Sequence, residues 1–184
     1  MLKDQLSMEQ IDVLLGAAVA AQSMHNTQPW RFEINGHVID VFLDGSRAFP
    51  AEDPTGRAMR IAAGTATFNL RCAAASMSYD SWLGLAPYPH EPDLLARIVV
   101  EPTGVPDQRL RELYAEIPCR HTSRVPLQAA ELSQDTRIDL VRAAYAEDAE
   151  LTWLSPSRST PPAATPRRPV SDFVRTTPPK EETR

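Results

Sequence analysis

The N-terminal part of the chain alternates apolar and polar positions with a helical period. Ser7 and Gln10 form the pattern of a capping box, in which each side chain bonds the backbone N–H of the other residue. The pattern therefore predicts a helix that starts after Ser7 and ends near Ala21. Six apolar residues would share one face of it: Met8, Ile11, Leu14, Leu15, Ala18 and Val19.

Several short apolar runs have the composition of β-strands. Residues 30–34 and 37–43 flank Asn35-Gly36, a dipeptide typical of a two-residue hairpin turn. Residues 79–85 and 95–101 predict two more strands around a proline-rich connection, and residues 150–154 predict a last one.

Three further helices are predicted among these strands. Asp53-Pro54 marks a helix start, because proline suits the first turn and aspartate can cap it. A run rich in small residues then continues from Arg57 to Met77, with an apolar stripe near one face. Residues 107–117 and 133–147 complete the set, the latter with Ile138, Val141, Ala144 and Tyr145 facing inward. Because helices and strands alternate irregularly, with a hairpin early, we expect an α+β layered fold.

The composition changes after Leu154. Residues 155–184 contain seven prolines and nine serines or threonines, and almost no large apolar residue. Such a segment cannot bury enough surface to offset the entropy of ordering it, so a disordered tail is expected.

Charge and cysteine usage limit the classes of partner and compartment. The first 154 residues carry 13 basic and 21 acidic residues, and this acidic balance argues against nucleic acid as a partner. No apolar run reaches a membrane span of roughly 18 residues, and no secretory signal is evident. Cys72 and Cys119 are too few for a disulfide framework, and the four histidines lack metal-ligand spacing. We therefore expect a cytoplasmic protein with no metal site and no membrane contact.

A polar loop between the first helix and the first strand is the leading candidate for a binding site. It reads Ser23-Met24-His25-Asn26-Thr27-Gln28-Pro29-Trp30-Arg31-Phe32. Asn26 and Gln28 can each donate and accept hydrogen bonds, which suits the mixed edge of a flavin, and Ser23 and Thr27 could serve its ribityl hydroxyls. His25 could present a proton donor or act only as a hydrogen-bond partner. In the plainer alternative, the amides cap the preceding helix and brace the hairpin.

Arg120-His121-Thr122-Ser123-Arg124 is the second candidate. Two guanidinium groups four positions apart, with the hydroxyl of Thr122 between them, can clamp one phosphate through forks of donors. The alternative is a solvated basic turn.

The loop resembles the Asn-x-Gln-Pro-Trp signature of FMN-dependent nitroreductases, and more narrowly the Acg-like mycobacterial branch, in which two lobes are fused. The resemblance covers about residues 8 to 154. It implies that Ser23 and Asn26 fall on positions that touch FMN, while Met24 replaces a frequent second serine. The string from Arg120 to Arg124 resembles the phosphate motif that opens a lobe. One FMN would then be held by Ser23, His25, Asn26, Thr27 and Gln28 together with Arg120, Thr122 and Arg124.

The resemblance also implies an organisation and an activity. Residues 1–118 would form a first lobe, residues 119–154 the start of a second, and residues 155–184 a tail that replaces the rest, as in a truncated copy. The activity would be FMN-dependent NAD(P)H oxidoreduction of a nitroaromatic or quinone, impaired by the truncation, with no catalytic side chain needed because FMN performs the chemistry. The alternatives are a flavin-sequestering protein without turnover and a non-functional fragment. A homodimer could complete the lobe pair. The small residues of the helix over residues 57–77 would lie at a lobe interface or allow close packing inside one lobe.

Overall fold

A computed structural model describes residues 5–102, 104–123, 125 and 131–153. The chain divides into two compact units, Met1–Thr122 and Ser123–Arg184, and each is described by itself. The predicted disordered tail, residues 155–184, and the candidate Arg124 lie outside the described residues. Whether residues 119–154 begin a second lobe stays a prediction.

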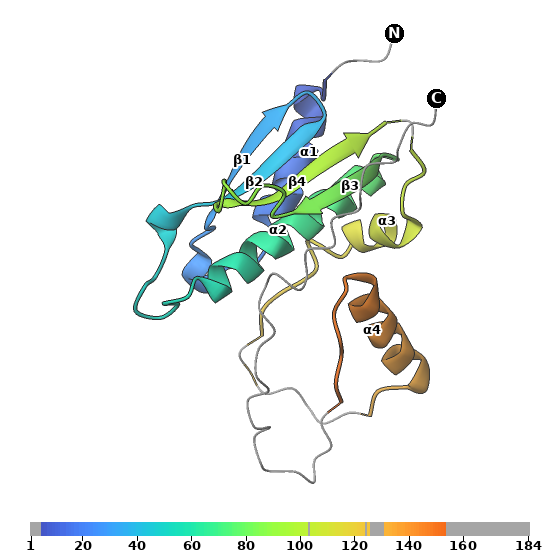
Figure 1. The fold of residues 1–184 in the computed structure, drawn as a ribbon. Coiled ribbons are helices and arrows are strands. Elements are labelled where there is room, and N and C mark those ends of the chain that lie inside the picture. Colours follow the sequence, from blue (N-terminus) through green and yellow to red (C-terminus); the bar gives the residue numbers. More distant parts are fainter. Residues whose placement is uncertain (1–4, 103, 124, 126–130, 154–184) are drawn as a thin grey trace, which may run out of the picture. The chain divides into compact units, whose positions relative to one another are not determined.

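The first unit is built on one antiparallel sheet of four strands (Figure 1). The strands are β1 (Trp30–Asn35), β2 (Val38–Leu43), β3 (Asp80–Leu85) and β4 (Leu94–Glu101), in the order β1-β2-β4-β3. All four were predicted within one residue at each end. The mixed, non-alternating order of helices and strands confirms the α+β prediction.

Three helices belong to this unit: α1 (Met8–Val19), α2 (Arg57–Ser76) and α3 (Gln108–Tyr114). Leu14 of α1 and Leu70 of α2 share one buried cluster with Ile39, Val41 and Ile98 of the sheet, so both long helices pack on the same sheet face. Helix α3 packs on α2, where its Leu110 meets Cys72 and Ala75. The loop after α1 and the segment after β2 therefore leave from a rigid body.

The predicted capping box at the start of α1 is confirmed. The Ser7 hydroxyl accepts a hydrogen bond from the Gln10 N–H at 3.3 Å, and the Gln10 side chain accepts one from the Ser7 N–H at 2.8 Å. The chain just before the cap is also fixed, because the buried Leu6 donates its N–H to the Gly36 carbonyl at 3.2 Å.

Small residues let α2 sit at the centre of the unit. The predicted stripe is confirmed for Ala63, Ala66, Leu70 and Ala74, which are fully buried. Close packing inside this unit accounts for the small side chains on that face of α2.

The hairpin turn lies one residue later than predicted. Asn35 pairs with Val38 as the last residue of β1, so the central turn residues are Gly36 and His37. Gly36 has φ 63° and His37 does not have a positive φ, which is the pattern of a type II′ turn with glycine at its first central position. The Asn-Gly signal located the hairpin but assigned the wrong two residues to its turn.

Helix α2 begins at Arg57, later than Asp53-Pro54 suggested. Gly56 takes φ 65°, and the carboxylate of Asp53 reaches past it to accept the Met59 N–H at 3.0 Å. Asp53 therefore caps the helix from outside its first turn. The N–H groups of Met59, Ala58 and Arg57 hold the pKa of Asp53 below its usual value.

This cap predicts a pH-dependent contribution to stability. Because the folded-state pKa of Asp53 is lowered, its contribution is present above the unfolded pKa of about 3.9 and is lost as pH falls through the folded value. Asp53→Asn should thus lower the melting temperature at neutral pH, with a deficit that shrinks in acid. Thermal unfolding by circular dichroism from pH 7 downward measures this, with Asp12→Asn on the exposed side of α1 as the charge-matched control. A deficit that is constant with pH contradicts the assignment.

The second unit contains α4 (Gln134–Ala146), as predicted, with the Ser133 hydroxyl accepting the Thr136 N–H at 3.1 Å. The prediction that its apolar residues face inward is wrong for Ile138, Val141 and Tyr145, whereas Ala144 is half-buried. Ile138, Val141 and Tyr145 are 38%, 43% and 82% exposed, because no second layer in the described part of this unit covers them. The predicted strand over residues 150–154 is also wrong for residues 150–153, which find no neighbouring strand among the described residues.

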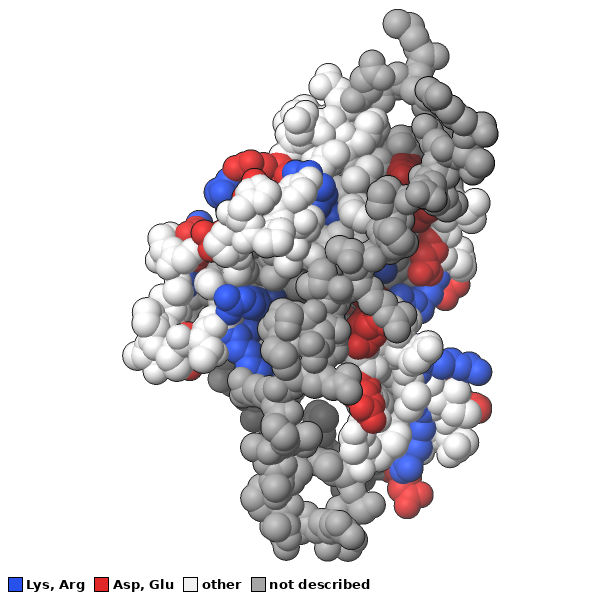
Figure 2. Space-filling view, in the orientation of Figure 1, with Lys and Arg blue, Asp and Glu red and all other residues white. Residues whose placement is uncertain are grey.

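Within the described ranges, no helix combines the length and the apolar character needed to cross a bilayer. Acidic and basic side chains are interspersed over the face of the molecule seen in Figure 2.

Candidate functional site

The backbone of the polar loop takes a conformation that side-chain-bearing residues rarely adopt. His25, Asn26 and Gln28 have φ values of 51°, 57° and 48°, within and just after the short 3₁₀ turn η1 (Met24–Asn26). Gln28 is further disfavoured there because it precedes Pro29. Left-handed residues of this kind cost on the order of 1 kcal/mol each and cluster at functional sites.

Two of the candidate side chains brace the loop itself. The Ser23 hydroxyl accepts the Gln28 N–H at 2.9 Å, and the Gln28 amide donates to the Val19 carbonyl at the end of α1 at 3.3 Å. These contacts agree with the alternative in which the polar side chains of the loop stabilise the end of the preceding helix and the loop itself. The Ser23 hydroxyl can still donate its own proton, and the Gln28 side-chain oxygen can still accept one.

The other polar side chains of the loop remain open to a ligand. Within the described part of the chain, the Asn26 amide and the Thr27 hydroxyl have no hydrogen-bond partner, and Asn26 is exposed. Together they offer three donor hydrogens and two acceptor oxygens on adjacent residues.

A segment that the sequence did not single out supports the loop from the side. It follows β2 and runs from Asp44 through η2 (Gly45–Arg47) to Glu52. Arg47 donates to the carbonyls of Thr27 and Gln28 at 3.4 and 3.2 Å. On the same segment, Glu52 lies 2.9 Å from the His25 ring nitrogen, and Phe49 contacts the His25 ring edge-on at 5.4 Å between centroids. No short motif joins these residues to the loop, so only the fold reveals them.

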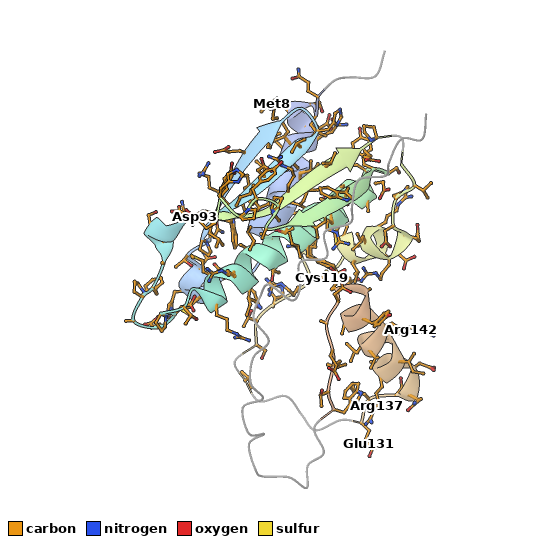
Figure 3. The ribbon with its side chains drawn as sticks, viewed as in Figure 1. Met8, Asp93, Cys119, Glu131, Arg137 and Arg142 are labelled. Carbon is orange, nitrogen blue, oxygen red and sulfur yellow. The ribbon has the colours of Figure 1, made fainter. Side chains whose placement is uncertain are left out.

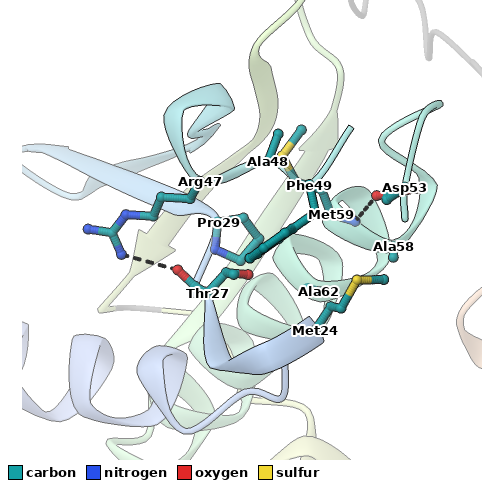
Figure 4. Close-up of a pocket in the computed structure, with 10 residues that line it drawn as sticks. All are labelled: Met24, Thr27, Pro29, Arg47, Ala48, Phe49, Asp53, Ala58, Met59 and Ala62. Carbon is teal, nitrogen blue, oxygen red and sulfur yellow. Dashed lines mark hydrogen bonds between the residues drawn. The ribbon is translucent and has the colours of Figure 1, made fainter. Parts of the chain in front are cut away.

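The space between the loop and this segment is small. Figure 4 shows it lined by Met24, Thr27, Phe49 and Met59 among ten residues, with Arg47 at one side. Its volume of about 10 Å³ is enough for one water molecule. A flat ring system would therefore have to lie on the outer surface of the loop.

The second candidate cluster lies against the start of the loop. Arg120 follows Cys119, which Figure 3 labels. The Arg120 guanidinium donates to the Ala20 carbonyl at 3.2 Å and to the Gln22 side-chain oxygen at 3.4 Å, and the Thr122 hydroxyl donates to the same oxygen at 3.0 Å. Gln22 directly precedes Ser23. Residues 98 to 100 positions apart are thus in direct contact.

The C-terminal end of α1 explains why the Arg120 guanidinium lies beside the Ala20 carbonyl. The last turn of α1 carries no basic residue of its own, and its carbonyls form the negative end of the helix dipole. Arg120 supplies the missing cation from far along the chain.

An apolar groove adjoins this guanidinium. It has a volume of about 250 Å³ and lies between the second half of α1 and the end of α3. Ala20 lines it, and the carbonyl of Ala20 accepts from Arg120. The surface can thus take a ligand with a flat apolar body and an anionic end. The groove lining is Gly16, Ala17, Ala20, Tyr114, Ala115, Ile117 and Pro118.

Comparisons with known proteins point in one direction. No protein-family model matches the chain. The "Putative NAD(P)H nitroreductase Rv3131" of Mycobacterium tuberculosis is 35% identical over 116 residues, which cover 63% of this chain and 33% of the relative. The "Putative NAD(P)H nitroreductase acg" of the same organism is 32% identical over 109 residues, which cover 59% of this chain and 33% of the relative. The chain thus spans about a third of the length of these relatives.

Solved structures give weaker likenesses. A nitroreductase in complex with FMN from Desulfovibrio desulfuricans is 21% identical, with a TM-score of 0.42 over 70% of this chain and 88% of that one. An NADH dehydrogenase/NAD(P)H nitroreductase from Bacteroides thetaiotaomicron is 20% identical, with a TM-score of 0.45 over 59% of this chain and 83% of that one. These scores are too low to establish a common fold by themselves. The sequence relatives confirm the predicted resemblance to Acg-like proteins: this chain is homologous, over 63% and 59% of its length, to the two Mycobacterium tuberculosis proteins named above.

Proposed function

We propose that this chain binds FMN and carries out NAD(P)H-dependent oxidoreduction of the nitroreductase type. The observation that carries the proposal is that Arg120 and Thr122 contact Ala20 and Gln22, the residues directly before the polar loop. The sequence resemblance implied that these two clusters share one cofactor. Their meeting across 98 to 100 positions supports that idea.

The side chains present fit the chemical groups of FMN. The open amide of Asn26 and the side-chain oxygen of Gln28 suit the pyrimidine edge, and the hydroxyls of Ser23 and Thr27 suit the ribityl chain. Arg120 and Thr122 would hold the phosphate through hydrogen bonds, those of Arg120 being charge-assisted. His25 is held by Glu52 beside this surface.

Within this proposal the protein binds and orients, and FMN supplies the hydride transfer when bound. The strained loop fixes the backbone that carries the Asn26 side chain before any ligand arrives, which limits the backbone entropy lost on binding. The match covers only about a third of the length of these relatives, so the activity in their names is proposed for this chain.

Titration with FMN tests the proposal directly. The purified protein should quench FMN fluorescence with a saturable curve, and Asn26→Ala should weaken binding by about 0.5–1.5 kcal/mol, the usual worth of a neutral hydrogen bond. Asn35→Ala, an exposed amide at the other end of β1, is the matched control and should bind as wild type does. A wild-type protein that gives no saturable quenching refutes FMN binding.

Anaerobic NADPH then separates turnover from storage. Bleaching of the visible flavin band in the loaded protein supports the oxidoreductase. A band that persists under excess NADPH and NADH supports a flavin-sequestering protein instead.

A further inference from the structure

The polar loop contains few internal hydrogen bonds and several residues with unfavourable backbone angles. Among the described residues, the hydrogen bonds within the loop are short-range backbone bonds and the bond from the Gln28 N–H to the Ser23 hydroxyl. Against these stand three residues with positive φ, one of them directly before a proline. Support from outside the loop is therefore part of what keeps the Asn26 amide in place.

Arg47 supplies this support at the point of greatest strain. Its guanidinium donates to the carbonyls of both Thr27 and Gln28. These two residues lie between Asn26 and Pro29. The guanidinium is itself fixed, because its Nε lies 3.1 Å from the Asp44 carboxylate. Asp44 in turn is held by the Ser46 hydroxyl and N–H, which together with Arg47 keep its pKa below the usual value.

Further bonds tie this segment to the same loop. The Asp44 N–H donates to the Pro29 carbonyl at 3.1 Å, and Glu52 and Phe49 both contact His25. The chain from Asp44 to Glu52 therefore touches the loop at its beginning and at its end. Among the described residues of this segment, Arg47 is the one that donates hydrogen bonds to the loop carbonyls of Thr27 and Gln28.

We propose that Arg47 is a positioning residue for the cofactor loop: it holds residues 24–28 in the binding-competent conformation without touching the cofactor. The inference rests on the proposed FMN site. Arg47 donates to carbonyls, which face it, while the ligand groups are the side chains of Asn26 and Thr27. Loss of Arg47 lowers the fraction of molecules whose loop is competent, and the apparent dissociation constant rises by the inverse of that fraction.

The test combines affinity with a direct view of the loop. Arg47→Met should raise the FMN dissociation constant about tenfold and speed amide hydrogen exchange in residues 24–28 of the ligand-free protein. The absorption spectrum at saturating FMN should stay that of the wild type, because the bound geometry is unchanged. Arg47→Lys should recover part of the affinity, since its ammonium can donate to the carbonyls but lacks the separate Nε–H that bonds Asp44.

Arg60→Met is the matched control. Arg60 also donates to a backbone carbonyl, that of Thr55, at 2.7 Å, but outside the loop, so FMN affinity and loop exchange should both stay at wild-type values. An Arg47→Met protein with wild-type affinity and exchange overturns the inference. So does a loss of affinity with unchanged exchange, or an altered spectrum at saturation, because either places Arg47 in contact with the cofactor. If wild-type protein does not bind FMN, the proposed function fails, and the exchange comparison still reports separately whether Arg47 restrains the loop.

Discussion

Leu70→Ala is expected to lower the free energy of unfolding by about 2–5 kcal/mol. Leu70 is fully buried in the middle of α2, in the cluster that joins Leu14 of α1 to Ile39 and Ile98 of the sheet. Three of the four residues one helical turn away from it, Ala66, Ala73 and Ala74, are alanines, whose side chains are too short to fill the space. The cavity therefore persists, and its cost adds to the lost transfer free energy.

Urea unfolding followed by circular dichroism measures this change. Ile61→Ala, on the same helix but with Ile61 51% exposed, is the control and should cost much less. Leu70→Met keeps the volume and should cost less than about 1.5 kcal/mol, which covers the case in which the alanine variant does not fold. Equal losses for Leu70→Ala and Ile61→Ala would contradict the central position of α2.

Arg120→Ala is expected to weaken FMN binding by about 1.5–3 kcal/mol, the worth of hydrogen bonds to a charged group. This corresponds to a dissociation constant raised about 10- to 150-fold. The guanidinium can direct two donors at one phosphate, and it is already placed at the start of the loop by Ala20 and Gln22. Fluorescence titration of FMN at fixed ionic strength measures the dissociation constant.

Arg111→Ala provides the comparison, because Arg111 is an exposed arginine on α3 in the same unit. Its titration curve should match the wild type. The FMN dissociation constant of Arg120→Lys should lie between those of the wild type and Arg120→Ala, since lysine keeps the positive charge but lacks the paired donors of the guanidinium. If Arg120→Ala binds FMN as tightly as the wild type, the phosphate assignment is wrong.

Local patterns predicted most of the first unit. The capping box and the apolar period located α1, and the turn signal located the hairpin, because each depends on residues a few positions apart. The errors concern the start of α2 and the position of the hairpin turn. Asp53 caps α2 across three intervening residues, and Gly36 takes the strained turn position that Asn35 was expected to share.

Helix α4 shows the other limit of pattern analysis. Its apolar residues have a helical period, and the helix is present, but a period alone does not state what covers the apolar face. Within the described part of the second unit, nothing buries Ile138, Val141 or Tyr145.

The assignment of these residues to a cofactor stays a prediction. The composition of the loop and of the residues from Arg120 onward identified two clusters, and the fold brings Arg120 and Thr122 to Ala20 and Gln22, just before the loop. The supporting role of Arg47, Phe49 and Glu52 could not be predicted, because these are single residues about 20 to 27 positions from their partners. The bracing role of Ser23 and Gln28 is likewise visible only once the loop is folded.

The bond between Leu6 and the hairpin turn has a practical consequence for all these experiments. It fastens the leading end of the chain where β1 finishes, whereas the polar loop precedes the first residue of that strand. Six residues of extended chain, about 20 Å, separate the two places. An affinity tag or a fluorophore attached ahead of Leu6 should thus leave cofactor measurements undisturbed.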